Sequence, residues 1–95
     1  MERKDILLSA QRAMLGAVTT NMQAIAIGYK KMPVILRVYF KTQPTEDECE
    51  LVKEITTEIV ADFNEKEITY IKEEIFVAQK LECLDDWLYL QHVNI

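Results

Sequence analysis

Apolar residues recur every three or four positions in two stretches of the chain, and this spacing predicts two amphipathic helices. The first is expected over residues 3–17, ending near Gly16 and the polar residues that follow. Its apolar stripe consists of Ile6, Leu7, Ala10, Ala13, Met14, Ala17 and Val18. The second is expected over residues 46–63, because Thr45 just before it and Glu48 in its first turn match a capping box. Its buried stripe consists of Val52, Ile55, Thr56, Ile59, Val60 and Phe63.

The rest of the chain alternates apolar and polar residues, which predicts strands. The four expected strands cover residues 22–29, 34–41, 67–77 and 87–93. A turn ending at Pro33 makes the first two a hairpin. The small residues of the first strand share one face, where we expect a helix to approach closely. Alternation breaks within the third strand, and a β-bulge near residues 72–74 would restore it. Residues 78–86 are expected to form a loop or short turn.

These elements predict an α+β fold in the order α-β-β-α-β-β, built as a single domain over residues 1–95. Two helices would pack on one face of a four-stranded, mostly antiparallel sheet, in two layers. The second strand supports this arrangement, since Val34, Val38 and Phe40 share an apolar face opposite a mixed one. The crossover through the second helix could make one strand pair parallel, and the sequence leaves the pairing order open.

Composition adds one informative feature, an uneven distribution of charge. The 95 residues are 49% hydrophobic and 28% charged, which is typical of a globular protein with one core. Residues 1–44 carry seven basic and two acidic side chains, a net charge of +5. Residues 45–95 carry four basic and fourteen acidic side chains, a net charge of −10. The asymmetry suggests an acidic face, although solvation of one half of the protein explains it equally well.

The acidic residues of the second helix are the first candidates for a binding site. Glu46, Glu50, Glu54 and Glu58 follow one another at four-residue spacing on the solvent side. Like charges at this spacing destabilise a helix by a few tenths of a kcal/mol per pair, and Lys53 offsets only one pair. A cationic partner would compensate this cost. Asp85 and Asp86 are further candidates, which could flank a pocket or bind a cation, although a solvated turn is the favoured interpretation.

No catalytic motif is evident, so the sequence predicts no enzyme, cofactor or metal. The single histidine, His92, lies outside any catalytic pattern. Glu73 and Glu74 point to opposite faces of a strand and cannot converge on one substrate. Cys49 and Cys83 are too few for a disulfide framework or a zinc site. The acidic balance argues against nucleic acid, and no apolar run is long enough to cross a membrane. We expect a cytoplasmic protein with reduced thiols.

Several segments resemble a family of small bacterial proteins of about this length. The segments are LLSAQRAMLGAVTTNMQAIAI, VILRVYF, TEDECELVKEITTEIVADF and WLYL, in this order. The family is similar to immunity proteins of toxin–immunity pairs, especially those of contact-dependent growth inhibition systems. The resemblance implies a non-enzymatic protein that binds a cognate toxin domain, often a nuclease, and blocks its active site or substrate surface. The loop at 78–86 and the C-terminal tail depart from the family pattern, and no site residue carries over.

The predicted function is therefore an immunity protein that occludes a basic toxin through its acidic face. The predicted contacts are Glu46, Glu50, Glu54, Glu58, Asp85 and Asp86. Aromatic anchors could come from Trp87, Tyr70 and Tyr89, although strand aromatics more often lie in a core. The alternative is a structural or regulatory module that forms a homodimer or pairs through an edge strand, for which residues 87–93 are the candidate. A small enzyme that depends on Asp85 or His92 is the third class.

Overall fold

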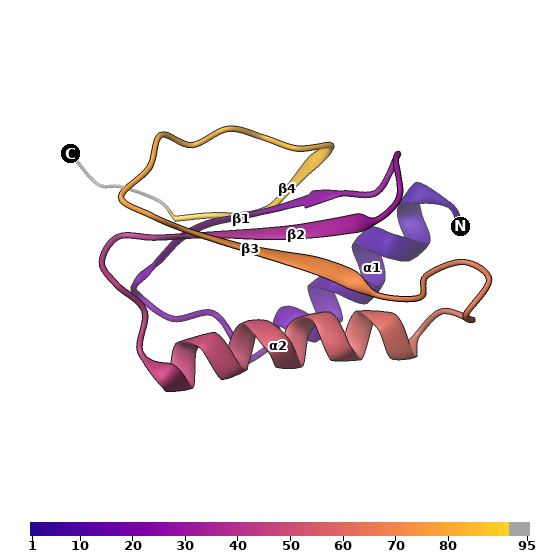
Figure 1. Ribbon diagram of the computed structural model, residues 1–95, viewed down its shortest axis with the longest axis horizontal. Helices are drawn as coiled ribbons and strands as arrows, with labels where there is room; N and C mark the ends of the chain where they lie inside the picture. The colour runs from indigo at the N-terminus through magenta and orange to yellow at the C-terminus, as the bar shows by residue number, and fades with distance from the viewer. Residues whose placement is uncertain (92–95) are drawn as a thin grey trace.

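The computed structural model describes residues 1–91 and has the predicted order α-β-β-α-β-β (Figure 1). The elements are α1 (Arg3–Met14), β1 (Met22–Gly28), β2 (Val34–Phe40), α2 (Glu46–Ala61), β3 (Ile71–Val77) and β4 (Asp86–Leu90). The predicted α+β architecture is confirmed. His92 and the end of the predicted fourth strand lie outside the described residues.

The four strands form one sheet in the order β3-β2-β1-β4. β1 pairs antiparallel with both β2 and β4, whereas β2 and β3 run parallel. The predicted hairpin and the mostly antiparallel sheet are therefore confirmed, and the crossover through α2 produces the one parallel pair. This order makes β3 and β4 the two edges of the sheet.

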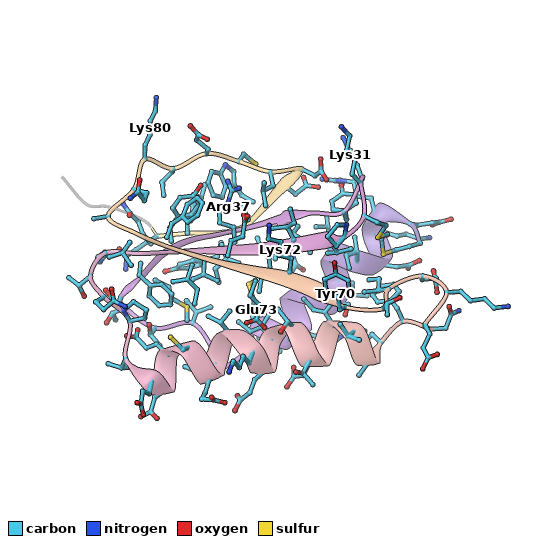
Figure 2. All side chains as sticks on the ribbon, in the orientation of Figure 1. Lys31, Arg37, Tyr70, Lys72, Glu73 and Lys80 are labelled. Carbon is cyan, nitrogen blue, oxygen red and sulfur yellow. The ribbon has the colours of Figure 1, made fainter. Side chains whose placement is uncertain are left out.

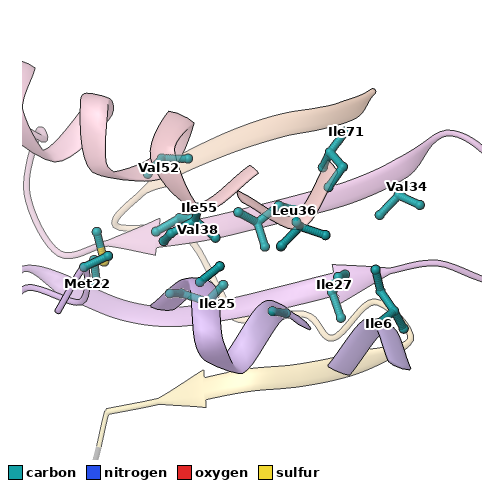
Figure 3. Close-up of a cluster of buried hydrophobic side chains, with 14 of the residues drawn as sticks. Ile6, Met22, Ile25, Ile27, Val34, Leu36, Val38, Val52, Ile55 and Ile71 are labelled. Atoms are coloured by element: carbon teal, nitrogen blue, oxygen red, sulfur yellow. The ribbon is translucent and has the colours of Figure 1, made fainter. Parts of the chain in front are cut away.

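Both helices cover the same face of the sheet, and the core lies between the two layers (Figures 1 and 3). β1 contributes Ile25 and Ile27 to this core, and α2 contributes Ile55, all fully buried. The expectation that a helix approaches the small-residue face of β1 is wrong. Ala24 and Ala26 alternate with the isoleucines and therefore point away from the helices.

The opposite face of the sheet is crossed by the segment that joins β3 to β4, residues 78–85 (Figure 1). Because β3 and β4 lie at opposite edges, their connection has to pass over β2 and β1. The Tyr39 hydroxyl holds this segment by donating to the Glu82 carbonyl (2.9 Å) and accepting from the Glu82 N–H (3.1 Å). Tyr39 is only 1% exposed as a result, although its strand pattern places it on the mixed face.

β3 is shorter than predicted, and the predicted β-bulge near residues 72–74 is wrong. The strand begins at Ile71 and stays in unbroken register with β2 from Val34↔Ile71 to Phe40↔Val77. Ile68 and Tyr70 precede it in irregular structure. The break in alternation therefore marks the start of the strand, because the earlier apolar residues need not follow its period.

Local signals fix the ends of both helices. α2 begins with a full capping box, in which the Thr45 side chain accepts from the Glu48 N–H (3.1 Å) and the Glu48 carboxylate accepts from the Thr45 N–H (3.1 Å). α1 ends at Met14, before the predicted boundary. Gly16 follows with a φ of +76°, a conformation that a residue without a Cβ adopts at little cost.

Candidate functional site

The outer surface of α2 carries the predicted row of acidic side chains, and all four are exposed. The row consists of Glu46, Glu50, Glu54 and Glu58. Lys53 is the one described cation within ion-pair distance of the row, with its Nζ 3.9 Å from a Glu50 oxygen. Arg12 of α1 pairs instead with Asp62 (3.3 Å), just beyond the end of α2. Most of the negative charge of the row is therefore not neutralised by the described residues.

The helix dipole explains why only some of the acidic side chains of α2 stabilise the helix. Glu46, Asp47 and Glu48 occupy the first turn, where the positive end of the helix dipole favours carboxylates. Glu54 lies beyond the first turn and gains nothing from the dipole, and Glu58 lies in the last turn, where the negative end of the dipole disfavours a carboxylate. A shallow hollow of about 450 Å³ lies beside them, lined by Glu50, Lys53, Glu54, Thr57 and Glu58.

Asp85 does not form a solvated turn, and it does not belong to the acidic row. Its Oδ2 accepts hydrogen bonds from the backbone N–H groups of Tyr29 (2.7 Å) and Lys30 (2.8 Å). The bond from Lys30, followed by that from Tyr29, lowers the pKa of the Asp85 carboxyl. Asp85 therefore satisfies two amides at the end of the β1–β2 hairpin.

Asp86 is also a structural residue. The guanidinium of Arg3 donates to it through Nε (3.1 Å) and Nη2 (2.9 Å), and the Tyr29 hydroxyl donates to Oδ2 (2.5 Å). These bonds, that from Arg3 first, lower the pKa of the Asp86 carboxyl. The prediction that both aspartates lie in a solvated turn is wrong, because the loop carrying them crosses the sheet and meets the hairpin. None of their described partners lies on α2.

The described residues contain neither a metal-binding cluster nor a helix able to span a membrane. No group of three or more histidine, cysteine, aspartate or glutamate side chains converges within residues 1–91. Within the same part of the chain, neither helix is long and apolar enough to cross a membrane. Cys49 and Cys83 are both free thiols. Glu73 and Glu74 diverge as predicted, since Glu73 accepts from Thr56 of α2 (2.6 Å) and Glu74 from Arg37 (2.8 Å) on the other face.

Comparison with protein families places the chain among immunity proteins. The family model described as MafI2 immunity protein matches residues 3–93, nearly the whole chain. The chain belongs to the MafI2 immunity protein family. A comparison with curated proteins finds no match. Membership confirms the resemblance to toxin–immunity proteins, and it gives the chain a toxin-neutralising role with a cognate toxin as its partner.

For a MafI2 family member, exposed aromatic side chains are candidate anchors for the toxin. The three predicted aromatic anchors differ in how far they are exposed. Trp87 and Tyr89 are half-buried, with the Trp87 ring 6.1 Å from that of Tyr39. Tyr70 is 60% exposed just before β3 (Figure 2). It lines a hollow of about 290 Å³ between α2 and β3. The sequence pattern did not predict this hollow. The break in alternation at Tyr70 indicates only the start of β3.

Proposed function

We propose that this MafI2 family member neutralises a basic nuclease toxin domain by covering its active site or substrate surface with the outer face of α2. The observation that carries the proposal is the exposed row of four carboxylates, which a single described cation accompanies at 3.9 Å. A nuclease has to attract a polyanion, so its substrate surface is basic. An acidic helix competes for that surface because it presents the same sign of charge.

Electrostatics would act mainly on the rate of association. Opposite charges steer two proteins together and raise the association rate by ten- to a thousandfold, an effect that salt screens over about 8 Å at physiological ionic strength. Side chains in the row are exposed, so they can pair with a basic surface while they stay partly hydrated. Tight binding needs buried apolar or aromatic contacts as well. We propose Tyr70 as the aromatic contact, because it is exposed and lines a hollow beside α2.

The proposed mechanism is occlusion, without catalysis by the immunity protein. Within the described residues, no nucleophile, base and orienting group come together, and Asp85 and Asp86 are occupied by backbone and side-chain partners. A protein acting this way inhibits its toxin one to one. Nuclease inhibition should therefore saturate at equal concentrations of the two proteins.

The experiment uses a candidate cognate nuclease toxin domain, chosen from the genes neighbouring this one, with association measured by stopped flow at two salt concentrations. Replacing Glu50, Glu54 and Glu58 together by glutamine should slow association by about tenfold at low salt, and much less at high salt. The matched control replaces Glu2, Glu65 and Glu82, three exposed acids outside α2, by glutamine. It removes the same formal charge and should have a much smaller effect.

Two results would contradict the proposal in different ways. A tight complex whose association rate responds neither to salt nor to the α2 substitutions would remove the acidic face from the mechanism and leave the immunity role intact. Failure to bind the neighbouring toxin, together with failure to protect cells that express it, would remove the immunity role toward that toxin.

A further inference from the structure

We propose that the outer edge of β3 binds an extended basic segment of the toxin, which adds to the sheet as another strand. This inference rests on the proposed function, because the toxin supplies the segment. It names a second part of the interface, next to the acidic row and formed mainly by backbone groups. Strand addition of this kind obtains affinity from main-chain hydrogen bonds and specificity from neighbouring side-chain pockets.

Of the two edges of the sheet, β3 is better suited to accept another strand. It has seven residues in continuous register with β2, and no described strand lies on its other side. β4 has five residues, and its pairing with β1 shifts register between Ile25 and Ala26. Natural edge strands are protected by proline, bulges, short length or a covering segment. β3 has none of these four features, and its protection is limited to the charged side chains of Lys72, Glu73 and Glu74.

The free hydrogen-bonding groups of β3 can be assigned from one contact. The Ala78 N–H donates to the Phe40 carbonyl of β2 (2.9 Å). Because N–H groups point to alternate sides along a strand, those of Lys72, Glu74 and Phe76 also face β2. The outward set is therefore Ile71, Glu73, Ile75 and Val77. Each has both an N–H and a C=O available to an incoming strand.

Side chains beside this edge form a partly apolar site. The hollow between α2 and β3 is lined by Thr56, Thr57, Val60, Thr69, Tyr70 and Ile71. Tyr70 lines this hollow and is 60% exposed (Figure 2). Ile75, further along the strand, is 37% exposed. An incoming strand would cover Ile75 and place a side chain against Tyr70. The exposed Tyr70 side chain therefore lies next to the unpaired edge of β3.

Charge favours a basic toxin segment over a second copy of this chain. Glu73 and Glu74 occupy the middle of β3. Two copies related by a two-fold axis would pair this strand antiparallel with itself, and an axis at its middle residue brings the two Glu74 carboxylates opposite each other. Glu74 already pairs with Arg37 (2.8 Å) and Lys72 (3.8 Å). A lysine or arginine of the incoming segment would therefore form its opposite-charge pair with Glu73. The Glu73 carboxylate accepts from Thr56 through Oε2, which leaves Oε1 for such a cation.

The β3 edge is continuous with the acidic row of α2. Thr57 lines both the hollow beside the row and the hollow between α2 and β3. A single partner can therefore contact the carboxylates with one surface and the edge of β3 with an extended segment. This continuity is why we assign the segment to the toxin that the acidic row is proposed to bind.

The test compares Ile75→Pro with Ile75→Val in binding to the toxin domain. Proline removes an N–H that faces away from the sheet, which an edge strand tolerates, whereas valine keeps it. We expect Ile75→Pro to weaken the complex by at least about tenfold and Ile75→Val by no more than about twofold. Thermal unfolding followed by circular dichroism should show that both variants are folded.

Amide exchange of the unmodified protein gives a measurement that does not depend on the fold of a variant. The amides of Ile71, Glu73, Ile75 and Val77 should exchange quickly in the free protein and slowly in the toxin complex. Unchanged exchange in a complex that neutralises the toxin would overturn this inference and leave the proposed function standing. Protection of these amides in the free protein, with concentration-dependent self-association, would assign the edge to a second copy instead. Absence of any complex would overturn both proposals.

Discussion

Glu48 at the start of α2 accepts a hydrogen bond of 2.5 Å from the hydroxyl of Thr19, a residue 29 positions earlier in the chain. The same carboxylate accepts from the Asn21 amide (3.3 Å) and from the Thr45 N–H (3.1 Å). It therefore completes the helix cap and also fixes the segment that leads into β1. Glu48 is 9% exposed, in contrast to the four glutamates of the outer row.

Replacing Glu48 by glutamine should lower the free energy of unfolding by about 1–2 kcal/mol, because charged hydrogen bonds and a cap are lost together. Urea denaturation measures this change. Glu50→Gln is the matched control, since Glu50 is exposed on the same helix and its loss should cost less than about 0.5 kcal/mol. Equal effects of the two substitutions would contradict the structural role of Glu48.

Stability should also fall in acid through this group. Hydrogen bonds from Thr19, followed by those from Thr45, lower the pKa of Glu48 in the folded protein. A carboxyl whose pKa is lowered on folding stabilises the protein fully above its unfolded pKa, near about 4.3 for glutamate. That contribution disappears as the pH falls through the lower, folded value. The melting temperature of Glu48→Gln should therefore approach that of the unmodified protein as the pH falls below about 4.

Asp85→Ala should lower the melting temperature, because the substitution leaves the Tyr29 and Lys30 amides without their acceptor. Glu65→Ala, at an exposed turn, is the control and should change it little. Toxin binding at saturating concentration should remain for Asp85→Ala at a temperature where the variant is folded. A selective loss of binding by a fully stable Asp85→Ala would support the predicted role of Asp85 as a toxin contact.

Ala26→Leu should destabilise the protein by about 1–3 kcal/mol through overpacking. Ala26 is fully buried and pairs with Trp87 of β4, on the face that the crossing segment covers. Ala61→Leu, at the exposed end of α2, should leave stability almost unchanged. Chemical denaturation distinguishes the two. A harmless Ala26→Leu would mean that the crossing segment leaves this face open.

Tyr70→Ala should weaken toxin binding by about ten- to a hundredfold, since an exposed tyrosine beside a hollow is typical of an interface hot spot. Its free energy of unfolding should change by less than about 0.5 kcal/mol, as expected of an exposed side chain. Isothermal titration calorimetry and urea denaturation measure the two quantities. Trp87→Ala is the contrasting variant. Because the Trp87 ring is half-buried, its loss should lower the free energy of unfolding more than it weakens toxin binding.

The sequence predicted those features whose signals are local. The capping box at Thr45, the hairpin turn before Pro33 and the apolar stripe of α2 each depend on residues close together in the chain, and each is confirmed. The exposed acidic row also follows from helical periodicity alone. Its role in binding stays a prediction.

Features that depend on distant residues were not predictable in this way. Asp85 and Asp86 look like solvated loop residues until the crossing segment brings them to Tyr29 and Arg3, more than 50 positions away. The small face of β1 favours any close neighbour, and the sequence could not show that this neighbour is a loop rather than a helix. The same limit applies to the hollow beside Tyr70, which needs α2 and β3 together.

The sheet order has a consequence for synthesis on the ribosome. β1 lies inside the sheet, yet one of its two neighbours is β4, which follows the other five described elements in the chain. Until residues 86–90 have left the ribosome, β1 has a bare edge lined by apolar residues, which is a site for aggregation. Arg3 likewise cannot form its hydrogen bond with Asp86 until that residue, 83 positions later, has been made. A nascent chain therefore completes this sheet only after β4 has left the ribosome, and truncations before β4 should accumulate as insoluble protein.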